Sequence, residues 1–272
     1  MAAIVGQEKL RGALDSYRID TMPKTLMLIG EPGCGKHLLS KALADRLSLA
    51  YVVISDEMTH DDLISYSQSP TPTMYVIEIS KFSEKQQNQF LKFIEEPAKC
   101  AFVVVLADSE VGVLPTISNR CLKLFFERYS DDQLKSLMPD PSKATPDFLA
   151  VCNTPGRLKA AESQNVEGLL SLCDSIVANI GKTSWANALK LVTKVNCGDE
   201  NDRFDFDLFF NALELAAFKA YKNGGTDADL AIYELVNKAK KDKANKSIAK
   251  DNFMLSFVTS MWKEANHEAD RA

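Results

Sequence analysis

The sequence predicts an α/β domain, built on a parallel sheet with helices on both faces, followed by a helical C-terminal half. Two observations support this prediction. Short apolar runs alternate with helical patterns as far as Phe126, which favours parallel strands joined by crossover helices. Beyond Phe126 no further strand pattern occurs, and apolar residues repeat at helical spacing.

The expected elements can be placed in chain order. An N-terminal loop over residues 4–8 precedes an amphipathic helix that carries Leu10, Leu14 and Tyr17. A helix with a capping box begins at Ser83 and ends before Pro97. Strands are expected at residues 26–29, 51–55, 74–79, 101–106 and 122–126. Helices are expected at residues 131–138, 147–152 and 157–162, and helical periodicity continues throughout residues 166–272.

Length and composition are those of an ordinary globular protein. With 272 residues, 46% hydrophobic and 25% charged, the chain is long enough for two or three domains. It has no apolar run near the roughly 18 residues of a membrane span, and its N-terminus lacks the features of a secretory signal. We therefore expect a cytoplasmic protein that does not bind membranes. Because the net charge is −5, contact with nucleic acid would require a local basic patch.

The cysteines predict neither a disulfide framework nor a zinc site. They are scattered and form no C-x-x-C pair, so we expect free intracellular thiols. The six positions are Cys34, Cys100, Cys121, Cys152, Cys173 and Cys197.

A glycine-rich stretch between the first strand and the next helix predicts a phosphate-binding loop. Glycines let successive backbone N–H groups point inward, and the N-terminus of the following helix favours anions. Lys36 would reach the β- and γ-phosphates of a nucleotide. The alternative is an ordinary glycine turn in another α/β unit. The residues expected to hold phosphate are Gly30, Pro32, Gly33, Cys34, Gly35 and Lys36.

The last position of this motif departs from the pattern. His37 stands where Ser or Thr would supply a hydroxyl to Mg²⁺, and magnesium prefers hard oxygen ligands in octahedral geometry. We therefore expect a degenerate magnesium site, at most weak binding of ATP or ADP, and impaired catalysis.

Four stretches, in this order, resemble the AAA+ subunits of DNA polymerase clamp loaders. They read IVGQ at residues 4–7, the phosphate loop, NQFLKFIEEP at residues 88–97 and LPTISNRC at residues 114–121. In the family the third reads close to N-a-L-L-K-t-L-E-E-P, and the fourth reads L-p-T-I-x-S-R-C. The resemblance covers residues 4–121, and the helical tail matches the family's collar domain only in size and class.

The resemblance implies a three-part chain. Residues 1–128 would form the AAA+ nucleotide-binding domain, residues 129–165 a small helical lid and residues 166–272 a helical collar. Val5, Gly6 and Gln7 would lie beside the adenine, and His37 would close the phosphate loop. Arg120 would be an arginine finger that reaches into the nucleotide site of a neighbouring subunit, an arrangement that stabilises charge on the transferring phosphoryl group. Without the motif, Arg120 would be read as a strand-end arginine in a surface ion pair.

Other departures concern hydrolysis. Aligned back from Asn88, the family's acidic pair falls on Ile77, which cannot bind a metal, and on Glu78. Glu78 stands where a water-activating glutamate would be and is equally well explained as a strand-end carboxylate. The sensor-2 arginine falls near Gly156, with Arg157 one place away. We include Arg157 among the candidate nucleotide-binding residues.

These departures, combined with the retained Arg120, resemble the δ′ subunit of DNA polymerase III, which is related to γ and τ. The resemblance implies a stator in a pentameric ring of clamp-loader subunits, which loads a sliding clamp onto primer–template DNA. The alternative is a catalytically active ATPase subunit. A small-molecule kinase is disfavoured, because the sequence shows no substrate-binding lid and ends in a long helical region. The family's zinc module is absent from residues 47–73, which suggests a compact variant encoded by a phage.

Two sets of lysines have open interpretations. Lys81, Lys85 and Lys92 would face duplex DNA in a loader ring, or simply promote solubility. A second basic run would contact DNA phosphates, or form the solvated face of a helix; it lacks interleaved aromatic residues, which favours the helix face. This run comprises Lys238, Lys240, Lys241, Lys243, Lys246 and Lys250. Trp185 and Trp262 are expected in the collar core or at a subunit interface.

Overall fold

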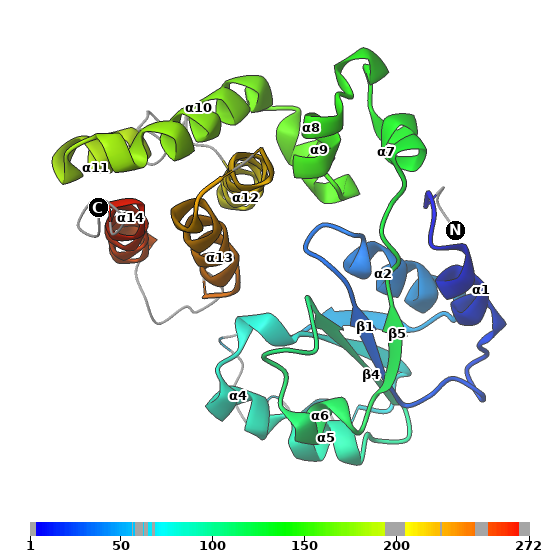
Figure 1. The fold of residues 1–272 in the computed structure, drawn as a ribbon. Helices are drawn as coiled ribbons and strands as arrows, with labels where there is room; N and C mark the ends of the chain where they lie inside the picture. The colour runs from blue at the N-terminus through cyan, green and yellow to red at the C-terminus, as the bar shows by residue number, and fades with distance from the viewer. Residues whose placement is uncertain are drawn as a thin grey trace. The chain divides into compact units, whose positions relative to one another are not determined.

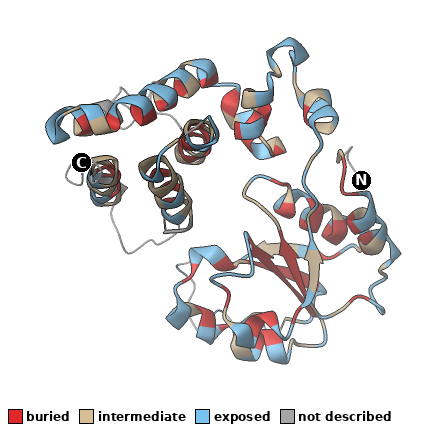
Figure 2. Cartoon of the chain, in the orientation of Figure 1, coloured by how far each residue is buried: buried red, intermediate tan, exposed pale blue. Residues whose placement is uncertain are grey.

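The structure is a computed structural model that describes residues 4–55, 57, 62, 65, 66, 69–193, 205–223, 225–242 and 250–266. The chain forms two compact units (Figure 1). The first comprises Met1–Gln133 with Thr154–Gly156, and the second comprises Leu134–Asn153 with Arg157–Ala272. Buried apolar residues form a core in each unit (Figure 2).

The first unit is built on a five-stranded sheet in which every pair of neighbouring strands is parallel, in the order β2-β3-β4-β1-β5. The strands are β1 (Thr25–Ile29), β2 (Ala50–Val53), β3 (Thr73–Glu78), β4 (Ala101–Ala107) and β5 (Leu122–Phe125). Each strand coincides with one of the predicted apolar runs to within two residues at either end, so the predicted parallel sheet is confirmed. The central strand β4 is buried along its whole length, as expected of a strand covered on both faces.

Helices cover both faces of this sheet, as predicted (Figure 1). Leu26 and Leu28 of β1 pack with the helices of one face, whereas Met27 and Ile29 pack with those of the other, because successive side chains of a strand point to opposite faces. On the first face lie α1 (Glu8–Ser16) and α2 (Lys36–Arg46), and on the second lie α4 (Glu84–Gln89), α5 (Leu91–Glu95) and α6 (Pro115–Ser118), with the short helix η1 (Ile79–Lys81) after β3.

The helix predicted to begin at Ser83 is divided in two. Its capping box is present, formed by Ser83 and Gln86. The helix is nevertheless interrupted at Phe90, whose N–H donates to the carbonyl of Gln87. A second helix, α5, begins at the next residue. Phe90 is buried and meets the ring of Phe82 edge-on at 4.8 Å between centroids. Burial of this ring accompanies the break that periodicity alone did not indicate.

The second unit is helical, and no strand follows β5 in the described part of the chain. In it α12 packs against α8, α10 and α13, and α14 packs against α11 and α13. Phe210 lies at its centre, 5.2 Å from the ring of Phe257. The helices after β5 are α7 (Asp131–Leu137), η2 (Pro141–Lys143), α8 (Pro146–Val151), α9 (Pro155–Ala161), α10 (Val166–Asn179), η3 (Ile180–Lys182), α11 (Trp185–Thr193), α12 (Phe206–Lys222), α13 (Asp227–Asp242) and α14 (Lys250–Asn266).

The side chains singled out in this helical half have varied surroundings. Trp185 is 40% exposed and therefore not a core residue, whereas the indole N–H of Trp262 donates to the carbonyl of Thr183 at 2.8 Å. Lys240 pairs with Glu214 inside the unit. Cys197, Lys243 and Lys246 lie outside the described residues. None of the described helices combines the length and apolar character needed to cross a membrane.

Candidate functional site

The predicted phosphate loop joins β1 to α2 (Figure 1). The N–H of Gly30 donates to the carbonyl of Ala107 at 3.1 Å, which attaches the start of the loop to the end of β4. Gly35, the residue before α2, has a φ of 100°, a left-handed conformation that favours glycine. The strand, glycine turn and helix inferred from the sequence are therefore confirmed.

The side chain of Lys36 contacts a carboxylate and two backbone carbonyls of its own chain. Its side chain is only 10% exposed, and its Nζ lies 2.9 Å from Oδ1 of Asp108. The same Nζ donates to the carbonyls of Gly30 and Glu31. Asp108 directly follows β4 and was not singled out from the sequence. A carboxylate of this chain thus neutralises the cation that the motif directs at phosphate.

His37, the irregular last position of the phosphate loop, contacts the candidate catalytic residue Glu78. Nε2 of His37 lies 3.1 Å from Oε1 of Glu78, and Nζ of Lys81 lies 2.6 Å from the same oxygen. Ile77 is fully buried in the core on the side of α4 and α5. His37 and Ile77 themselves supply no oxygen ligand of the kind that Mg²⁺ prefers. Among the described residues, no group of three or more His, Cys, Asp or Glu side chains is placed to hold a metal.

Hydrogen bonds from outside the loop hold its main chain. The hydroxyl of Tyr129 donates to the carbonyl of Cys34 at 2.8 Å, and the hydroxyl of Thr154 donates to the carbonyl of Pro32 at 3.0 Å. Burial of Cys34 raises the pKa of its thiol to about 11. Neither Tyr129 nor Thr154 was expected to contact the loop.

Gly156 approaches the loop more closely than any other residue type would allow. Its N–H donates to the carbonyl of Gly33 at 2.8 Å, and a Cβ at this position would lie 2.6 Å from the Cα of Gly33. The position to which the resemblance assigns the sensor-2 arginine is therefore filled by backbone in direct contact with the loop. Arg157 is buried in the second unit, where it hydrogen-bonds Asn153.

The residues expected beside the adenine form the N-terminal connection of the first unit. Gly6 and Gln7 both have positive φ values, 71° and 60°, and Val5 is partly buried. The side-chain amide of Gln7 donates to the carbonyl of Glu127 at 2.7 Å and accepts from its N–H at 2.8 Å. This pair of bonds attaches the N-terminal loop to the segment after β5.

Arg120 lies near the amino-terminal ends of the parallel strands, whereas the phosphate loop lies at their carboxyl-terminal ends. It lies two residues before Leu122, the first residue of β5. Leu122 pairs with Leu26 near the start of β1, whereas the loop follows the end of β1. About four residues of strand separate the two ends, roughly 13 Å at the usual rise per residue. Arg120 therefore does not belong to the site that Lys36 forms.

The guanidinium of Arg120 is held by residues of its own unit. One nitrogen lies 3.0 Å from Oε1 of Glu95, and the other donates to the carbonyl of Thr116 at 2.7 Å. The side chain remains 36% exposed. Glu95 belongs to the stretch at residues 88–97, so two of the stretches that carry the family resemblance meet in this ion pair.

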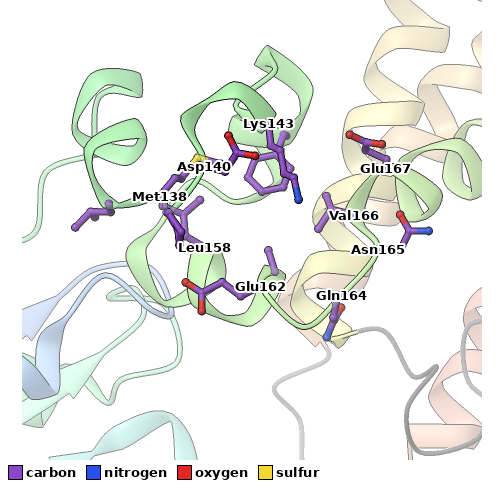
Figure 3. Close-up of a pocket in the computed structure, with 13 residues that line it drawn as sticks. Met138, Asp140, Lys143, Leu158, Glu162, Gln164, Asn165, Val166 and Glu167 are labelled. Carbon is purple, nitrogen blue, oxygen red and sulfur yellow. The ribbon is translucent and has the colours of Figure 1, made fainter.

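A separate hollow of about 580 Å³ lies in the second unit, among α7, α8, α9 and α10 (Figure 3). Leu158 and Val166 line its apolar part, and Asp140, Lys143 and Glu162 line its polar part. It contains none of the site residues inferred from the sequence.

Part of the first unit matches a known protein family. Residues 54–130 match the family model described as "DNA polymerase III, delta subunit". This match runs from the end of β2 past β5 and includes Glu78 and Arg120, but not the phosphate loop. No curated protein sequence matches the chain.

Solved structures show which fold the chain adopts. The RuvB Holliday junction branch migration motor of Thermotoga maritima is 15% identical, covering 93% of this chain and 88% of its own, with a TM-score of 0.50. A DNA polymerase III gamma subunit-related protein of Thermotoga maritima MSB8 is 16% identical, covering 95% of this chain and 99% of its own, with a TM-score of 0.47. The chain shares the fold of RuvB, and its residues 54–130 are a domain related to the DNA polymerase III delta subunit family.

Proposed function

We propose that this chain is a δ′-like stator subunit of a DNA polymerase clamp loader. It does not hydrolyse ATP itself, and it donates Arg120 to the ATPase site of a neighbouring subunit. The family-model match over residues 54–130 supports membership of such a loader. The loader would place a sliding clamp on primer–template DNA in the cytoplasm of a bacterial cell, whether the gene is bacterial or phage-encoded.

One observation carries the proposal: the contact of the His37 imidazole with the Glu78 carboxylate at the end of the phosphate loop. In a working site this position holds a hydroxyl ligand of Mg²⁺, close to the carboxylate that activates water. Here an imidazole replaces the hydroxyl and pairs with the carboxylate, while Ile77 is buried in the core. The chemistry of these donors does not fit magnesium, so we assign no hydrolytic step to this chain.

The position of Arg120 supports its role as a finger. Because it lies at the edge of the sheet opposite the phosphate loop, it is too distant to stabilise charge on a nucleotide held by Lys36. A nucleotide on an adjoining subunit is the remaining target. Its partly exposed guanidinium and its fixed contacts with Glu95 and Thr116 suit such a role.

The remaining parts follow from the proposed assembly. Residues 129–165 would act as a lid, and the helices of residues 166–272 would form the collar that joins this subunit to its neighbours in a pentameric ring. Lys81, Lys85 and Lys92 would face the DNA inside that ring. ATP or ADP would bind this chain weakly, with Val5, Gly6 and Gln7 beside the base and Arg157 near the phosphates.

The test is ATP turnover by the reconstituted loader, assembled with the partner subunits, clamp and primed DNA of the same genome. Arg120→Ala should lower turnover strongly, by roughly 10³-fold at the neighbouring site if the finger acts as in other nucleotidases. Lys36→Ala should leave it nearly unchanged. Arg18→Ala is the matched control, because it removes an exposed arginine of the same unit that lies outside the motif stretches.

The opposite pattern would refute the proposal. If Lys36→Ala abolishes turnover and Arg120→Ala does little, the chain is a catalytically active ATPase subunit. Turnover by the isolated chain, sensitive to Lys36→Ala, would lead to the same conclusion.

A further inference from the structure

The basic side chains around the phosphate loop already contact carboxylates of the same chain. Lys36 pairs with Asp108, while His37 and Lys81 both face Glu78. A phosphate-binding loop works because its lysine and its backbone N–H groups attract an anion. In this chain the carboxylate of Asp108 already pairs with Lys36.

The sheet, rather than a loose loop, places Asp108 there. Ala107 is the last residue of β4 and pairs with Ile29 of β1, and the carbonyl of Ala107 accepts the N–H of Gly30. Asp108 is the next residue, so two adjacent parallel strands bring it to the start of the loop. Its carboxylate lies 2.9 Å from a lysine nitrogen that is largely buried.

We propose that Asp108 acts as an internal substitute for phosphate and thereby sets the low affinity of this loop for nucleotides. This inference rests on the proposed function only for the class of ligand, a nucleoside diphosphate or triphosphate. An incoming phosphate must either displace the carboxylate from Lys36 or lie beside a like charge. Both cost binding free energy, because unit charges a few ångströms apart repel appreciably even at the dielectric of a partly exposed site.

Asp108→Asn removes the charge and keeps an oxygen that can accept from Lys36. The variant should therefore bind ATP and ADP roughly tenfold or more tightly than the natural sequence. Since the loop offers no oxygen ligand set for Mg²⁺, the gain should be the same with magnesium and with EDTA. Adding Lys36→Met to Asp108→Asn should return the affinity to that of the natural sequence.

The experiment is calorimetric titration of the isolated full chain with ATP and with ADP, after thermal unfolding has shown that each variant is folded. Asp45→Asn is the matched control. It makes the same change in charge in α2, where Asp45 pairs with Lys41 on an exposed surface, and it should not alter affinity. Asp108→Ser provides a second test should the asparagine variant fail to fold.

Two results would overturn the inference. One is a folded Asp108→Asn or Asp108→Ser variant whose affinity equals that of the natural sequence. The other is a gain in affinity that Asp45→Asn reproduces, which would reflect net charge alone. The outcome is separable from that of the stator proposal: loss of ring turnover in Arg120→Ala does not depend on Asp108, and titration of the isolated chain does not depend on Arg120.

Discussion

Replacing Gly156 with alanine tests whether the segment of residues 154–156 holds the phosphate loop in place. The new Cβ would lie 2.6 Å from the Cα and 3.0 Å from the carbonyl oxygen of Gly33. Both are backbone atoms and cannot rotate away. The two segments must move apart, which lengthens the hydrogen bond from the Gly156 N–H to that carbonyl, now 2.8 Å.

The cost can be assembled from its parts. Forcing an extra carbon into a packed contact costs about 1–3 kcal/mol, and weakening the hydrogen bond costs about 1 kcal/mol. Alanine returns up to about 1 kcal/mol in the first turn of α9, because glycine is the poorer helix former. The free energy of unfolding should therefore fall by about 1–4 kcal/mol, which lowers the unfolding midpoint by about 2–4 °C per kcal/mol in a chain of this size.

Differential scanning calorimetry measures the change, with Gly12→Ala as the control. Gly12 lies on the exposed face of α1, and a Cβ there would meet nothing within 4 Å. The same substitution should thus stabilise the protein by about 0.5–1 kcal/mol. A Gly156→Ala variant as stable as the natural protein, alongside a stabilised Gly12→Ala variant, would show that residues 154–156 do not pack on the loop as described.

Two further predictions concern Arg120 and Cys34. Glu95→Gln should lower turnover of the reconstituted loader by up to about fivefold, because the exposed ion pair that orients Arg120 is worth at most about 1 kcal/mol; the adjacent Glu96→Gln serves as control, and equal effects would contradict the role of Glu95. The pKa of Cys34, raised to about 11 by burial, leaves about a hundredfold less thiolate at pH 8 than an ordinary thiol has. N-ethylmaleimide should then modify the partly exposed Cys100 before the buried Cys34, and Cys34 should react faster as the pH rises. Peptide mass spectrometry would detect early modification of Cys34 if this is wrong.

Much of the first unit could be predicted because its strands appear in the sequence as short, continuous apolar runs. The run at residues 101–106 is apolar throughout, and β4 is buried throughout. The turn at residues 30–36 combines glycines with a lysine in a pattern that is specific to phosphate-binding loops. The division of the helix at Phe90 was not predictable, because it accompanies the packing of that ring against Phe82, a tertiary contact that periodicity does not encode.

The site was predictable as a set of positions, but not as a set of contacts. His37 was identified as an irregular position and Glu78 as a candidate water-activating carboxylate, yet only the fold brings them within 3.1 Å of each other. Asp108 is 72 positions from Lys36 in the chain, and no local pattern links the two. One signal was available: Asp108 follows a predicted strand, and the carboxyl ends of parallel strands meet at one edge of a sheet, where ligands bind.

Residues 154–156 also determine how this protein can be divided. They belong to the first unit, although the chain on either side of them belongs to the second. A fragment that stops at residue 133 would lack Thr154 and Gly156. It would therefore lose the hydrogen bonds that these residues donate to the carbonyls of Pro32 and Gly33. Expression of the sheet with an intact loop thus requires the chain to continue through residue 156. Cloning boundaries, circular permutations and inserted tags should leave residues 134–156 continuous with the sheet.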